Sequence, residues 1–164
     1  MKFNYLSLPE LPKDQRKLVG FIVDDVCYGL PIMSVREVIN PGAVTKVPSL
    51  PSFVLGVAEH RDDVIPIVNL RARFGLPSIE RTRRSKWIIA VINRREVGFE
   101  VDRVTEVTTV DPSMKRERPF LTTKHDPWIA EVFHVKSALL FELALSTLID
   151  DKIFSSIVPE VEGA

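Results

Sequence analysis

The feature that most constrains this chain is an internal repeat of apolar, hairpin-like segments. Aligning Gly29 with Gly98 sets two such segments against each other at a constant offset. The same offset matches further pairs of residues: Val19 with Ile88, Val23 with Ile92, Val35 with Val104, Glu37 with Glu106 and Val38 with Val107. Because self-similarity at a fixed period is typical of a duplicated structural unit, we expect the fold to be built from two similar parts.

Short apolar runs separated by turn residues predict a mainly β protein. The clearest runs are 18–23, 64–68, 87–92 and 138–141. Polar turn residues at 24–25 and 93–96 join the first and third runs to the strands that follow, as in β-hairpins. A small sheet removes its exposed edges most simply by curling into a barrel. We therefore expect two small five-stranded β-barrel subdomains packed side by side, with short helices.

The length of 164 residues suits one ordinary domain. We expect an N-terminal tail over 1–16, a single domain over 17–157 and a C-terminal tail over 158–164. The repeat predicts subdomain halves over 17–78 and 86–150.

Helices and connections are expected between the strands. Short helices are predicted at 32–39, where apolar residues recur on one helical face, near 70–74, and around 145–157. The arginine-rich crossover at 78–86 is either a solvated loop or a contact for an acidic partner. Three prolines and many charges over 111–127 predict an extended connection rather than a regular element.

The composition excludes several classes of function. Lys plus Arg equals Asp plus Glu at 22 each, so no net charge attracts nucleic acid, and the aromatic residues lie in core-like runs rather than on a basic face. The lone Cys27 reads as a small buried hydrophobe in a reducing compartment. Early charges and prolines leave no signal peptide, and charges interrupt the apolar stretch over 128–148, so we expect a cytoplasmic protein without membrane insertion.

The sequence offers little support for catalysis or cofactor binding. The glycines are too scattered for a phosphate-binding loop, and the histidines lack metal-ligand spacing, so no cofactor and no metal are expected. The charged run Glu59–Asp63 is the one cluster with chemical potential. Its place between two apolar strands favours a hairpin tip, whereas a small metal-dependent enzyme using His60, Asp62 and Asp63 is the alternative.

The chain resembles the CheW-like coupling proteins of bacterial chemosensory pathways over residues 17–150. The strongest signal is the segment 56–71, which is similar to the central motif of that family: a Gly-Val, an Asn-Leu-Arg-Gly hairpin and Pro-Ile-Val-Asp-Leu-Arg. Segments 28–39 and 97–104 add to the resemblance. It implies two five-stranded barrels and a non-catalytic adaptor. The implied partners are the regulatory domain of a CheA-like histidine kinase and the cytoplasmic tip of a chemoreceptor, with recruitment to receptor arrays.

The resemblance also implies partner-binding roles for six residues: Val35, Glu37, Val38, Gly56, Arg61 and Gly98. We include His60, which replaces the leucine of the family motif, in the same predicted set. For Gly56 and Gly98 the structural alternative is backbone conformation or close packing. For Val35 and Val38 it is burial in the core. Arg61 either binds a partner carboxylate or braces its own hairpin.

One departure from the family pattern falls inside the central motif. This chain has Glu59-His60-Arg61-Asp62 where the family has Asn-Leu-Arg-Gly. An ionisable ring replaces an apolar side chain, and the glycine that tolerates positive φ is absent. We therefore hypothesise a specialised partner, or an accessory coupler that binds only one of the two usual partners. Unchanged binding after restoring Leu at 60 and Gly at 62 would remove this hypothesis.

Overall fold

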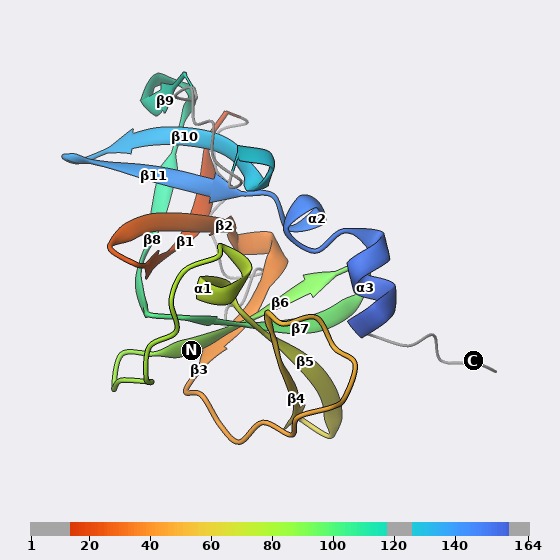
Figure 1. The fold of residues 1–164 in the computed structure, drawn as a ribbon. Helices are drawn as coiled ribbons and strands as arrows, with labels where there is room; N and C mark the ends of the chain where they lie inside the picture. The colour runs from red at the N-terminus through yellow and green to blue at the C-terminus, as the bar shows by residue number, and fades with distance from the viewer. Residues whose placement is uncertain (1–13, 118–125, 158–164) are drawn as a thin grey trace.

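The computed structural model describes residues 14–117 and 126–157, which form two β-sheets with short helices at their junction (Figure 1). One sheet contains β8 (Arg103–Val110), β1 (Arg16–Val23), β2 (Val26–Pro31), β11 (Ala138–Leu143), β10 (Ile129–Val135) and β9 (Lys115–Arg116), in that order. The other contains β3 (Val35–Ile39), β6 (Lys86–Ile92), β7 (Arg95–Val101), β5 (Asp63–Asn69) and β4 (Val54–His60). The helices are α1 (Leu70–Arg73), α2 (Leu145–Leu148) and α3 (Asp151–Ile157), with 3-10 turns η2 (Ile32–Ser34), η3 (Pro112–Met114) and η4 (Asp126–Trp128).

Each sheet combines strands from both halves of the sequence. The hairpin β1–β2 sits between β8 and β11, and its repeat equivalent β6–β7 sits between β3 and β5. Equivalent strands therefore occupy equivalent places, as the sequence repeat predicts. The division into halves over 17–78 and 86–150 does not correspond to the two sheets. The parallel pairings β2–β11 and β5–β7 join distant parts of the chain and exchange strands between the halves.

The mainly β fold class is confirmed, and the two sheets form barrel-like units. One unit has the expected five strands, and the other gains the two-residue strand β9 as a sixth. Neither strand order closes into a complete backbone ring. In the five-stranded sheet the edge strands are β3 and β4, and side chains join them, as described below.

The predicted helix over 32–39 is wrong. Only Ile32–Ser34 forms a 3-10 turn, and Val35–Ile39 is the edge strand β3. The pairing of β3 with β6 shifts its register between Val35 and Glu37. Such a bulge breaks the alternation of a strand, so the apolar spacing imitated one face of a helix.

The other predicted helices are present, and the connections are partly corrected. Helix α1 lies within the range 70–74, and α2 and α3 share the range 145–157. The crossover 78–86 is exposed except at Ser85 and Lys86. The connection over 111–127 contains η3 and β9 in its described part, so it is not merely extended, and residues 118–125 lie outside the described residues.

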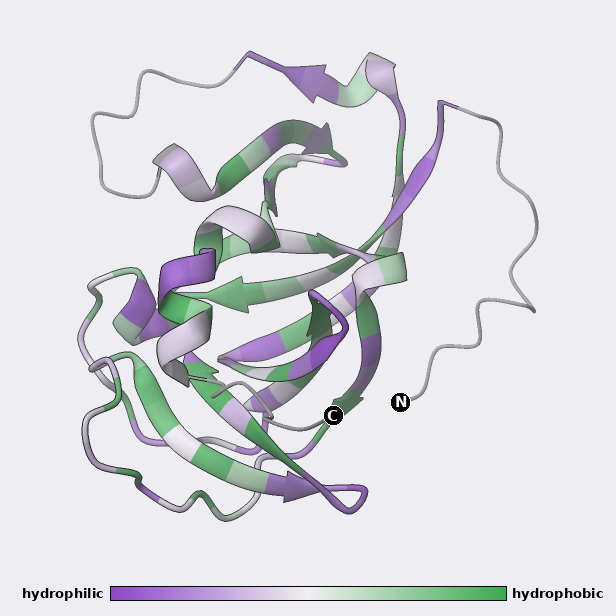
Figure 2. Ribbon diagram, turned by 90° about the vertical axis from the view of Figure 1, so that its right-hand side faces the viewer, coloured by the Kyte–Doolittle hydropathy of each residue, from purple (hydrophilic) through white to green (hydrophobic). Residues whose placement is uncertain are grey.

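The largest core lies between the two sheets. It includes Phe21 and Leu30 from one sheet and Ile88 and Phe99 from the other, none of them accessible to solvent. Figure 2 shows hydrophobic residues along the strands and hydrophilic residues at hairpin turns. Burial of each large apolar side chain contributes about 2 kcal/mol, so this shared core holds the two units together.

Within the described parts of the chain, no helix has the length and hydrophobicity needed to cross a membrane.

Candidate functional site

The bulge in β3 places an acidic residue in the interior at one end of the five-stranded sheet. Val35, Glu37 and Val38 are all buried, and Glu37 is only 7% exposed. A buried carboxylate needs compensating partners, because removing a charge from water is costly. The residues that pair with Glu37 therefore form the centre of the candidate site.

The partners of Glu37 come from the β4–β5 hairpin. Its two-residue turn, Arg61 and Asp62, has positive φ at both positions (50° and 69°), which is the geometry of a type I′ turn. The predicted hairpin tip at Glu59–Asp63 is therefore confirmed. Asp is among the residues that tolerate this conformation, so Asp62 can stand at the position of the family's glycine.

Glu37, His60 and Arg61 form one hydrogen-bonded group, which we call the Glu37 cluster. Arg61 Nε lies 2.8 Å from Glu37 Oε1, and Arg61 Nη2 lies 3.2 Å from Oε2. His60 Nε2 lies 2.7 Å from the same Oε1. The His60 side chain is 11% exposed, whereas that of Arg61 is 53% exposed. The cluster therefore has a buried anion, a mostly buried ring and an arginine that faces solvent.

The charge state of Glu37 follows from its neighbours. Burial acts to raise the pKa of Glu37, but the hydrogen bonds and positive charge of Arg61, together with His60, hold that pKa below its ordinary value of 4.5. Glu37 is thus an ionised carboxylate at neutral pH.

The Glu37 cluster also joins the two edge strands of its sheet. Glu37 belongs to β3, and His60 ends β4, at the opposite edge of the strand order. Backbone hydrogen bonds between Thr45 and Val57, at 2.8 and 2.9 Å, add a second link. The side-chain contacts connect β3 with the end of β4, and the bridge connects β4 with the segment that follows β3.

The remaining predicted site residues are buried or closely packed. Val35 and Val38 are buried. Gly56 has φ +145°, and a Cβ there would lie 2.8 Å from Val44 Cγ1 and from the Thr45 carbonyl carbon. At Gly98 a Cβ would lie 2.6 Å from Ile67 Cδ1 in the parallel neighbour β5. These four positions shape the barrel end, whereas Glu37, His60 and Arg61 lie together.

The repeat produces a second, more exposed version of this arrangement. Glu106 in β8 is the repeat equivalent of Glu37, and Lys136 Nζ in the β10–β11 turn lies 2.7 Å from Glu106 Oε1. Lys136 has φ 55°, similar to the 50° of Arg61. Both side chains of this second pair are mostly exposed. Burial is therefore what distinguishes the Glu37 cluster.

A third charged group, which we had not predicted, links the two sheets. Arg71 donates from Nε to Asp102 Oδ1 at 2.9 Å and from Nη2 to Asp102 Oδ2 at 2.8 Å. The backbone N–H of Asp24, in the β1–β2 turn, donates to Asp102 Oδ2 at 2.9 Å. Burial acts to raise the pKa of Asp102, and Arg71 lowers it overall. Arg71 lies in segment 56–71 and Asp102 in segment 97–104, so the family resemblance of these segments is the sequence feature that could have identified both residues.

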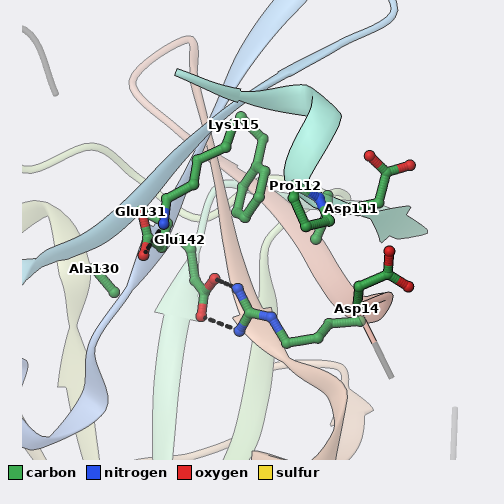
Figure 3. Close-up of a pocket in the computed structure, with 10 residues that line it drawn as sticks. Asp14, Asp111, Pro112, Lys115, Ala130, Glu131 and Glu142 are labelled. Atoms are coloured by element: carbon green, nitrogen blue, oxygen red, sulfur yellow. Dashed lines mark hydrogen bonds and ion pairs between the residues drawn. The ribbon is translucent and has the colours of Figure 1, made fainter. Parts of the chain in front are cut away.

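A pocket of about 460 Å³ opens on the six-stranded sheet (Figure 3). Arg16 donates to both carboxylate oxygens of the buried Glu142, at 2.9 and 2.6 Å. Lys115 pairs with Glu131 at 2.9 Å. Each of these two cations is therefore paired with a carboxylate of the pocket wall.

Within residues 14–117 and 126–157, no group of three or more His, Cys, Asp or Glu side chains is arranged to hold a metal ion. The His60 imidazole, which the enzyme alternative would use, is hydrogen-bonded to Glu37.

Comparisons with known proteins agree with this architecture. The family model described as a CheW-like domain matches residues 17–152. A chemotaxis protein CheW from Helicobacter pylori is 35% identical over 101 residues, which cover 58% of this chain and 61% of that protein. The chemotaxis protein CheW of Bacillus subtilis is 28% identical over 149 residues, which cover 90% of this chain and 96% of that protein.

A solved structure extends the likeness to three dimensions. The crystal structure of the scaffolding protein TtCheW from Thermoanaerobacter tengcongensis matches with a TM-score of 0.77 and 28% identity, covering 84% of this chain and 94% of that one. The family match, the relatives and the fold agree, and the chain belongs to the CheW-like domain family.

Proposed function

We propose that this protein is a non-catalytic adaptor that couples chemoreceptors to a CheA-type histidine kinase. The observation that carries the proposal is the Glu37 cluster, in which a 53% exposed arginine is held at a barrel end by a buried carboxylate. A guanidinium positioned in this way can form paired hydrogen bonds with a partner carboxylate. It offers binding geometry rather than a reactive group.

The partners follow from the family. Relatives are named chemotaxis proteins, and the structural neighbour is named a scaffolding protein. We assign the Glu37 cluster to the regulatory domain of the kinase and propose that the receptor tip binds a different face of the molecule. Weak individual contacts are sufficient in such an assembly, because several modules bind together. The proposed location is the cytoplasm, at receptor arrays.

The test is affinity capture from native lysate with wild-type protein and Arg61→Glu, followed by mass spectrometry. Lys152→Glu is the matched control, since it makes the same charge change at an exposed position on α3. We expect wild-type and Lys152→Glu to capture a CheA-like kinase and a receptor, and Arg61→Glu to lose most of the kinase. Capture of neither partner from a lysate that contains both would overturn the proposal. Capture of only one would identify an accessory coupler.

A further inference from the structure

His60 and Arg61 bind the same oxygen of a buried carboxylate. Nε2 of His60 and Nε of Arg61 lie 2.7 and 2.8 Å from Glu37 Oε1. The two donors differ in their exposure to solvent, because the imidazole is 11% exposed and the arginine side chain 53% exposed. Arg61 is therefore the donor that a partner can more readily reach.

The departure of Arg61 has an electrostatic consequence. Glu37 would be left as a buried anion without its strongest compensating charge, which is unfavourable unless another positive charge replaces it. Histidine is the side chain that can acquire this charge near neutral pH. A leucine or glutamine at position 60 could not.

We propose that His60 is a positioning residue that takes up a proton when Arg61 moves from Glu37 to a carboxylate of the docking partner. The proposal rests on the proposed adaptor function and defines the chemistry of the partner as acidic. In the free protein, His60 Nε2 lies 2.7 Å from Glu37 Oε1. On docking, Nδ1 accepts a proton from solvent, Glu37 stays ionised and Arg61 keeps its charge. Docking is therefore stronger at lower pH within the range where histidine titrates.

The charges around His60 are consistent with this role. Glu37 faces it from β3, and Arg61 follows it in the turn. Asp63 is its cross-strand partner on β5, with Glu59 and Asp62 beside it on the hairpin, and these three side chains are exposed. Arg36, also on β3, is paired with Glu96 at 2.8 Å. Once Arg61 has left Glu37, the carboxylate of Glu37 remains in contact with His60, and a carboxylate neighbour favours a protonated imidazole.

The proposed coupling between Arg61 and His60 can be tested without a partner. Replacing Arg61 by Gln imitates its departure, and replacing His60 by Gln keeps a donor but removes the titratable charge. Urea denaturation of wild-type, Arg61→Gln, His60→Gln and the double variant is measured at about pH 6 and about pH 8. With His60 present, we expect Arg61→Gln to lower the urea midpoint about twice as much at the higher pH as at the lower pH. With Gln at position 60, the fall in midpoint should be equal at the two pH values. Equal falls with His60 present would overturn the inference.

The partner experiment separates this inference from the adaptor proposal. Calorimetry with the kinase regulatory domain is run in two buffers of different ionisation enthalpy, which reports protons taken up on binding. Wild-type is expected to take up a fraction of one proton and His60→Gln none. Binding without proton uptake by wild-type would refute the role of His60 while leaving the adaptor function intact. Absence of binding in both buffers would count against the adaptor function, and the denaturation series would then decide the role of His60.

Discussion

Glu37 and Arg61 form a bidentate ion pair between a buried edge strand and a solvent-facing hairpin turn, with contacts of 2.8 and 3.2 Å. The pair links β3 to the β4–β5 turn across the open side of the five-stranded sheet. The ion pair thus connects β3 with the β4–β5 turn and positions Arg61, the residue proposed to bind the partner. The two interpretations of Arg61 are compatible, because the side chain braces the hairpin in the free protein and passes to a partner carboxylate in the proposed docking.

Glu37→Gln is expected to destabilise the protein by about 2 kcal/mol at neutral pH, because it removes the charged acceptor of two donors. The pKa of Glu37 lies below 4.5 in the folded state, so its contribution is present above the unfolded pKa and is lost as pH falls through the folded value. The gap between wild-type and variant should therefore close in acid, as measured by urea denaturation from neutral pH to below the folded pKa. Glu106→Gln, at the exposed equivalent, should change stability little at any pH. A gap that persists unchanged in acid would contradict this account.

Arg71→Met should cost about 2 kcal/mol, because it removes the charged donors to Asp102 and leaves it with the Asp24 backbone N–H. The matched control is Arg36→Met, which breaks an exposed ion pair with Glu96 and should cost less than about 1 kcal/mol. Guanidinium denaturation of both variants measures the difference. Equal losses would show that the Arg71–Asp102 link adds nothing beyond a surface pair.

Gly56→Ala should be among the most damaging small substitutions, with a loss of about 3 kcal/mol or more from positive φ and overpacking together. Its new Cβ would meet the backbone of Thr45, which cannot move aside as a flexible side chain can. Gly75→Ala is the control, since Gly75 also has positive φ (74°) but has no atom within 4 Å of the added Cβ. It should lose only about 1 kcal/mol, the cost of the backbone conformation. Similar melting temperatures for the two variants would refute the steric part of the argument.

Arg73→Lys should lose about 1 kcal/mol despite keeping the positive charge. The Arg73 guanidinium carbon lies 4.7 Å from the ring centroid of Phe53 and 4.5 Å from that of Trp128, and Nε donates to the Leu148 carbonyl at 2.9 Å. A planar guanidinium can contact both rings, whereas a compact ammonium cannot reproduce both contacts. Thermal denaturation provides the measurement, and unchanged stability of the lysine variant would argue against the stacking.

Much of the local structure was predictable from the sequence. The turns at Asp24-Asp25 and Arg61-Asp62 were recognisable from polar residues between apolar runs, and both adopt positive φ. The short helix after Asn69 was also predictable, and Asn69 caps it by accepting from the Ala72 N–H at 3.1 Å. These features depend on residues close together in the chain, so a local pattern contains the necessary information.

The interleaving of the halves and the burial of Glu37 were decided by the tertiary structure. The repeat indicated two similar units, but the pairing of β2 with β11 and of β5 with β7 determines which strands each unit contains. The bulge that buries Glu37 exists only because β3 pairs with β6, whose partner residues lie about fifty positions away. Strands and turns follow from local propensity, whereas strand partners and buried charges depend on which arrangement of the whole chain gives the lowest free energy.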